Sequence, residues 1–178
     1  ALLHTKGKTT GSVEKFDLTE EYKKHVLKFL KPNVKNVKIA IDASNGMAGK
    51  MVPAVFGDLD IEIIPINFEH TGKFVHEPNP LVEENLAELK EKITQEGCDF
   101  GICFDGDADR LIMVDETGRT IGCDLLTALM VPYFLENEPG STVVYDLRSS
   151  WVVIEEVINH GGTPRRERVG HAYMKKAL

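Results

Sequence analysis

Cysteine is scarce in this sequence, and the few cysteines show no metal-binding spacing. Among 178 residues there are three, Cys98, Cys103 and Cys123, with no C-x-x-C pair. An odd number of cysteines without that spacing argues against a disulfide framework and against a zinc site. We therefore expect buried free thiols in a chain that resides in a reducing compartment.

The sequence also lacks an excess of positive charge and a long apolar run. Its net charge is -7, whereas a nucleic-acid-binding protein needs a basic face to displace counterions from phosphates. No apolar run approaches the roughly 20 residues that cross a bilayer, and segment 1–12 lacks the apolar core of a signal peptide. These absences predict a cytoplasmic protein that binds neither nucleic acid nor membranes.

Two glycine motifs of nucleotide-binding proteins, G-x-x-x-x-G-K-[ST] and G-x-G-x-x-G, are absent as well. What the sequence does contain is a regular alternation of strand and helix patterns, with 42% apolar residues to fill a core. Strands are predicted at 37–44, 61–68 and 99–104, and helices at 17–30, 46–59 and 79–97. This alternation is typical of an α/β fold with a largely parallel sheet.

Two of these helices have defined ends and faces. Pro32 should end the helix at 17–30. The helix at 79–97 should place four apolar residues on one face and end at Gly97. Those residues are Leu81, Leu86, Leu89 and Ile93.

A second unit is predicted after a strand at 110–115 and a turn at 116–118. Its helices are expected at 124–137 and 150–162 and its strands at 142–147 and 164–170, and a further helix begins near residue 171. We therefore expect one domain over 1–118 and another over 119–178. About sixty residues bury a core poorly, so the second domain is expected to be incomplete. The predicted fold is α/β, with two consecutive three-layer α/β/α domains and mixed, largely parallel sheets.

Three aspartates at alternate positions follow the strand predicted at 99–104. Asp105, Asp107 and Asp109 are followed directly by Arg110, and carboxylates this close raise one another's pKa unless a cation lies between them. An EF-hand would need Gly where Arg110 stands and a preceding helix. A solvated acidic turn without a ligand is the other alternative. Oxygen-only ligands in a short loop favour Mg²⁺, which completes its shell with water or phosphate oxygens.

Three further stretches follow predicted strands, where ligands bind in α/β sheets. Segment 41–50 has a glycine turn that can present N–H groups to a phosphate, although a packing turn is more common. Ser44 in this turn has no neighbouring base in the sequence, so we do not predict it as a nucleophile. Arg148 and His171 follow the later strands, and the residue pattern alone leaves their roles open between function and structure.

These motifs in this order resemble the α-D-phosphohexomutase superfamily, and most closely its phosphomannomutase/phosphoglucomutase branch. The resemblance begins near residue 12 and covers nearly all of the remaining chain. The matching segments are DASNGMAG at 42–49, HEPNPLVEENL at 76–86, FDGDADR at 104–110, YDLRSS at 145–150 and VGHAYMK at 169–175. That family has four domains around a cleft, and this chain is similar to the second domain and most of the third.

The resemblance implies a role for each candidate residue. It assigns Asp105, Asp107 and Asp109 to Mg²⁺ and places Arg110 beside the reacting phosphate. Arg148 stands where many relatives carry Lys, which implies a catalytic or phosphate-orienting role. His171 matches the Gly-His loop of mannose and glucose phosphate enzymes, which implies a catalytic and substrate-binding role.

The implied reaction interconverts hexose 1-phosphate and hexose 6-phosphate through a phosphoserine and a bisphosphorylated sugar. The substrate would be mannose or glucose phosphate. The family's serine loop, its later sugar loop and its fourth domain have no match in this sequence. Domains 1 and 4 of the same protein are therefore expected as partners, and the chain alone is expected to be inactive.

Other functions remain open from the sequence. A phosphoglucosamine mutase would usually carry Gly-Asp-Arg in place of the Gly-His pair at Gly170 and His171. A non-catalytic scaffold would use the aspartates to hold a structural ion. A phosphatase would use Asp105 as its nucleophile.

Overall fold

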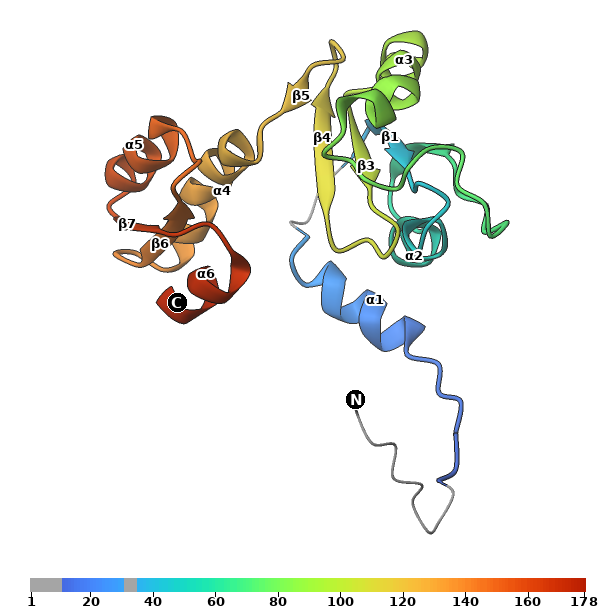
Figure 1. The fold of residues 1–178 in the computed structure, drawn as a ribbon, viewed down its shortest axis with the longest axis horizontal. Helices are drawn as coiled ribbons and strands as arrows, with labels where there is room; N and C mark the ends of the chain where they lie inside the picture. Colours follow the sequence, from blue (N-terminus) through green and yellow to red (C-terminus); the bar gives the residue numbers. More distant parts are fainter. Residues whose placement is uncertain (1–10, 31–34) are drawn as a thin grey trace, which may run out of the picture.

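The computed structural model describes residues 11–30 and 35–178, and it contains two β-sheets (Figure 1). The first sheet has five strands in the order β2-β1-β3-β4-β5. β1 pairs in parallel with both β2 and β3, whereas β4 and β5 continue the sheet in antiparallel pairing. The strands are β1 Val37–Asp42, β2 Ile61–Ile66, β3 Phe100–Phe104, β4 Leu111–Asp115 and β5 Thr120–Ile121.

Helices cover both faces of this first sheet and make it a three-layer structure. The helices that precede or connect its strands are α1 Thr19–Leu27, α2 Ala48–Phe56 and α3 Ala87–Glu96, with a 3-10 turn η1 at Glu83–Leu86 before α3. Because side chains alternate along a strand, Cys103 of β3 packs in the cluster with α3, whereas Phe100 and Ile102 pack in the cluster with α2. The predicted α/β layout is therefore confirmed for this part of the chain.

The helix predicted at 79–97 begins later than expected. Leu81 lies before η1 and its side chain is 64% exposed, so its place on the buried face was wrong. Pro78 and Pro80 disfavour the helical conformation in the residues before them, which delays the helix. Leu86, Leu89 and Ile93 are buried as predicted, and the left-handed Gly97, with φ of 64°, ends the helix.

The expectation for the cysteines is confirmed in part. Cys98 and Cys103 are buried free thiols, and burial raises the pKa of Cys103 to about 12. Cys123, the first residue of α4, is exposed instead of buried. The residue expected to end the first helix, Pro32, lies outside the described residues.

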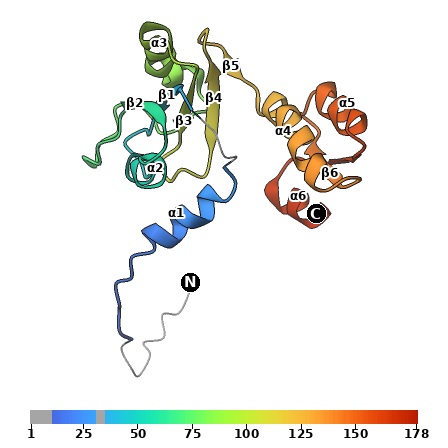
Figure 2. The ribbon, with the colours of Figure 1, turned by 180° about the vertical axis from the view of Figure 1, so that it is seen from behind.

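The second sheet is small and parallel, and its helices form a separate lobe (Figures 1 and 2). Its core joins three residues of α4 to Tyr145 of β6 and to Val153 and Val157 of α5. The elements of this lobe are α4 Cys123–Asn137, β6 Thr142–Asp146, α5 Trp151–Asn159, β7 Thr163–Glu167 and α6 His171–Ala177.

The segment that connects the two sheets begins after residue 121, and not at the predicted turn at 116–118. β5 pairs with β4 and so belongs to the first sheet. The domain division at 118 stays a prediction, and the pairing of β5 would place it a few residues later. Among the described residues, no helix is both long enough and apolar enough to cross a membrane.

Candidate functional site

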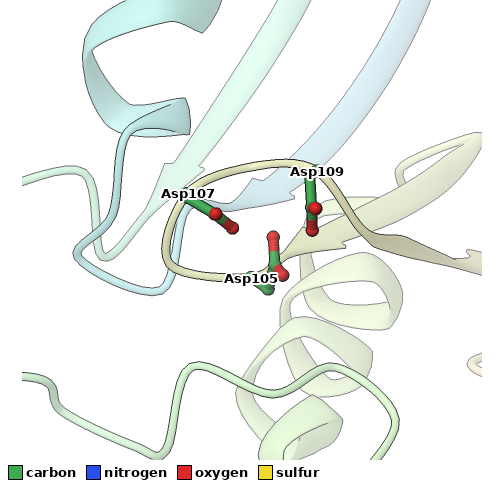
Figure 3. Close-up of side chains that lie close together, drawn as sticks. All are labelled: Asp105, Asp107 and Asp109. Atoms are coloured by element: carbon green, nitrogen blue, oxygen red, sulfur yellow. The ribbon is translucent and has the colours of Figure 1, made fainter. Parts of the chain in front are cut away.

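Residues 105–110, here called the aspartate loop, join β3 to β4 as a tight hairpin connection. The Asp105 N–H donates to the Arg110 carbonyl at 3.1 Å, and Ala108 takes a left-handed φ of 62°. This fold turns the three carboxylates toward one another (Figure 3), with one oxygen of each lying within 4.8 Å of the others. Asp105 is buried, whereas Asp107 and Asp109 are exposed.

Arg110 supplies the positive charge nearest to these carboxylates. Its backbone N–H donates to Asp105 Oδ1 at 3.1 Å and its Nε donates to Oδ2 at 2.7 Å. Burial alone would raise the pKa of Asp105, but these hydrogen bonds and the guanidinium charge hold it below the ordinary value. The pKa of Asp109 is raised instead, first by the charge of Asp107 and then by its contact with Asp105.

The donor set suits a small, hard cation. All three groups offer carboxylate oxygen, and two of the three side chains are exposed. A divalent cation would also relieve the mutual repulsion that raises the pKa of Asp109. The residues present therefore fit Mg²⁺.

The turn at 43–47 packs directly against the aspartate loop. Ser44 Oγ donates to the Phe104 carbonyl at 2.6 Å, and the Met47 N–H donates to the Gly106 carbonyl at 3.0 Å. A Cβ on Gly46 would lie 2.4 Å from the Gly106 oxygen, so only glycine allows this approach.

The same contacts identify this segment as a packing turn. The N–H groups of Asn45, Gly46 and Met47 all donate to backbone carbonyls of the protein. They do not form an anion-binding cradle. The buried hydroxyl of Ser44 donates to the Phe104 carbonyl, so it is not available as a nucleophile.

A buried acid and a histidine lie behind this turn, and sequence reasoning missed them. Asp42 at the end of β1 is fully buried, and its Oδ2 lies 3.0 Å from His76 Nε2. An acid that ends an apolar strand, as in VKIAID at 37–42, was the available signal, because a buried carboxylate requires a partner.

Arg148 lies apart from the aspartate loop, at the end of β6. Its Nη2 donates to Asp146 Oδ2 at 2.7 Å, and its side chain is 75% exposed. It lines an open hollow of about 470 Å³, whose other residues all belong to the second lobe except Leu81. The other residues of this hollow are Leu81, Cys123, Asp124, Thr127, Val144, Tyr145, Asp146, Ser149 and Met174.

His171 begins the short helix α6 and is exposed. It does not line the hollow that contains Arg148, although Met174 of the same helix does. Within the described residues, no hydrogen bond or ion pair links either Arg148 or His171 to the aspartate loop. The structure thus groups the three aspartates with Arg110 and places Arg148 and His171 in the second lobe.

Several known proteins are similar to this chain over most of its length. Phosphomannomutases from Vibrio cholerae and Escherichia coli are each 34% identical to it, over 175 and 177 residues, which is 94% of this chain and 38% of each relative. A solved phosphoglucomutase/phosphomannomutase family protein from Burkholderia thailandensis superposes with a TM-score of 0.87 at 30% identity, covering 94% of this chain and 36% of that protein. This chain therefore spans little more than a third of the relatives' length.

The family described as phosphoglucomutase/phosphomannomutase, α/β/α domain II, matches residues 20–118. The match contains the turn at 43–47, the Asp42–His76 pair and the whole aspartate loop. Because it covers more than half of the chain, this protein belongs to the phosphoglucomutase/phosphomannomutase family.

Proposed function

We propose that this chain is the metal-binding and part of the substrate-binding portion of a phosphohexomutase that interconverts hexose 1-phosphate and hexose 6-phosphate. The observation that carries the proposal is the convergence of Asp105, Asp107 and Asp109 beside Arg110 at the end of β3. Ligands of open α/β sheets bind at the carboxyl ends of strands, which is where this loop lies. The substrate would be a mannose or glucose phosphate.

The three aspartates would hold Mg²⁺, and the bound ion would supply positive charge to a transferring phosphoryl group. Arg110 would remain beside it, because its guanidinium holds Asp105 ionised and adds a second positive charge. Phosphoryl transfer depends mainly on such positioning and charge neutralisation.

Arg148 would orient a phosphate rather than remove a proton. The hydrogen bond to Asp146 raises the pKa of the Arg148 guanidinium, which is already too high for the group to lose its proton and act as a general base. Its planar guanidinium remains largely exposed at the hollow and can bind phosphate oxygens with two donors. His171 would contact the sugar phosphate, in line with the mannose and glucose branch over a phosphoglucosamine mutase.

A phosphatase that uses Asp105 as its nucleophile fits less well. That carboxylate is 1% exposed and both of its oxygens accept hydrogen bonds from Arg110. An attacking oxygen needs an open approach to phosphorus. A purely structural ion also fits poorly, because Asp107 and Asp109 are exposed and leave room for a phosphate oxygen.

A chimaera tests this function. In it, the chain replaces the matching 38% of the Escherichia coli phosphomannomutase, so that the host supplies the remaining segments. We expect the chimaera to convert mannose 1-phosphate to mannose 6-phosphate in the presence of Mg²⁺, and we expect the chain alone not to do so. Release of inorganic phosphate without isomerisation would favour the phosphatase, and a folded chimaera that neither isomerises nor hydrolyses would contradict the proposal.

A further inference from the structure

The Asp42–His76 pair is buried behind the aspartate loop and has no part in the reaction proposed above. Asp42 Oδ1 accepts from the Ser44 N–H at 2.8 Å and from Asn67 Nδ2 at 3.3 Å, while Oδ2 faces His76 Nε2 at 3.0 Å. The other ring nitrogen of His76, Nδ1, lies 2.8 Å from the Glu77 carbonyl. Both ring nitrogens therefore face acceptors, and only the protonated imidazolium donates to both.

The surroundings of His76 favour that protonated form. Its titratable neighbours are Asp42 from β1 and Glu88 from α3, and Asn67 Nδ2 donates to both of these acids. Burial lowers the pKa of His76, but the Glu77 carbonyl and the two acids outweigh it and raise the pKa above 6.5. Asp42 and His76 thus form an ion pair that is only slightly accessible to solvent on the histidine side.

Two routes lead from this pair to the aspartate loop. In the first, Asp42 accepts a hydrogen bond from the N–H of Ser44, whose backbone is left-handed with φ of 48°. Ser44 Oγ in turn donates to the carbonyl of Phe104, the residue before Asp105. In the second, His76 fixes the segment that continues to Pro78. The ring of Pro78 lies close to Gly106, where an added Cβ would meet it at 3.7 Å.

We propose that Asp42 and His76 are positioning residues for the aspartate loop, and that their ion pair sets the arrangement of the three carboxylates without touching the metal. Ser44, through Phe104, and Pro78, through Gly106, transmit this constraint to the loop. The effect on metal affinity rests on the magnesium site proposed above. The effect on the loop itself does not, so the two can fail separately.

The main test compares the chain with His76→Gln, which keeps one donor toward Asp42 but cannot carry the positive charge. The matched control is His160→Gln, because His160 also faces an acid, Glu156, but directly follows α5 in the second lobe. Backbone hydrogen exchange of the metal-free proteins is measured at the Met47 amide, which donates to Gly106, with the Cys98 amide at the end of α3 as reference. We expect about tenfold faster exchange at Met47 in His76→Gln, little change at Cys98, and no change in His160→Gln.

The second readout is the affinity for Mg²⁺, followed by the amide resonances of Gly106 and Asp107 at about pH 6 and about pH 8.5, on either side of the usual histidine range. Because the pKa of His76 is raised, the imidazole is protonated and the ion pair with Asp42 is complete below about pH 6.5. The ion pair is lost as the pH rises through the raised pKa of His76. We therefore expect the unsubstituted chain to bind Mg²⁺ more weakly at about pH 8.5 than at about pH 6. His76→Gln should bind about tenfold more weakly at the lower pH and should show no such pH dependence.

The outcomes separate the claims. Unchanged Met47 exchange and an unchanged affinity profile in folded His76→Gln would overturn the positioning role. Faster exchange at Met47 without any Mg²⁺ binding in the original chain would support positioning of the loop and overturn the magnesium assignment. If His76→Gln does not fold, Ser44→Ala removes the hydroxyl contacts with the Phe104 carbonyl and with Cys103 Sγ, and unchanged Met47 exchange in that variant would likewise overturn the positioning role.

Discussion

Replacing Asp107 with Asn is expected to lower the turnover of the chimaera about 10²-fold or more in both directions of the reaction. The amide keeps the shape of the side chain but removes one of the three negative charges that would hold Mg²⁺. Asp107 is exposed, so the fold should not suffer. The measurement is the steady-state rate with mannose 1-phosphate and with mannose 6-phosphate as substrate, together with the melting temperature. Substrate affinity should change much less than the rate.

Glu116→Gln is the matched control for this experiment. Glu116 is an exposed acid in the turn after β4, and its substitution removes the same charge outside the aspartate loop. The control should keep the rate of the unsubstituted chimaera. A similar rate for Asp107→Asn would mean that the aspartate loop does not hold the catalytic metal.

Replacing Arg148 with Ala is expected to reduce the same rate about 10²-fold, because it removes the cation that would orient the phosphate. Arg148→Lys should keep much of the activity, since a positive charge remains although the planar pair of donors is lost. The readout is the full steady-state comparison of the two variants in the chimaera. A pH profile that does not change in Arg148→Lys would also agree with an orienting role over a general-base role.

Arg119→Ala provides the control, because Arg119 makes the same kind of contact. Its Nε donates to Asp115 Oδ2 at 2.8 Å and its side chain is 79% exposed, close to the exposure of Arg148. If Arg148→Ala is as active as Arg119→Ala, then Arg148 is an ordinary surface residue that pairs with Asp146.

The parts of the fold that depend on local pattern could be predicted from the sequence. Apolar runs at 37–44, 61–68 and 99–104 became β1, β2 and β3. The reason is clearest for β1, whose last four residues are buried, because a strand covered on both faces needs few polar residues. The grouping of the aspartates followed from their alternate spacing after β3. The helix predicted at 79–97 begins later in the structure, because the spacing of apolar residues does not reflect the effect of the two prolines that delay it.

The environment of the aspartate loop could not be predicted in the same way. His76 and Asp42 are 34 residues apart, and their contact depends on how the segment after β2 returns over the end of β1. The turn at 43–47, which follows Asp42, needs left-handed conformations at Ser44 and Asn45, and residues other than glycine seldom adopt them. Such contacts arise from the tertiary arrangement, so the sequence pattern does not indicate them.

Whether Asp105, Asp107 and Asp109 form a magnesium site is tested most directly by titrating the chain with Mg²⁺ and with Ca²⁺ while the amides of residues 105–110 are monitored. We expect Mg²⁺ to shift these resonances with millimolar affinity and to bind better than Ca²⁺, and we expect Asp107→Asn to remove the response. The affinity should be weak because three carboxylates leave much of the shell to water or to a phosphate oxygen. Submicromolar binding, or a preference for Ca²⁺ over Mg²⁺, would contradict a phosphoryl-transfer site.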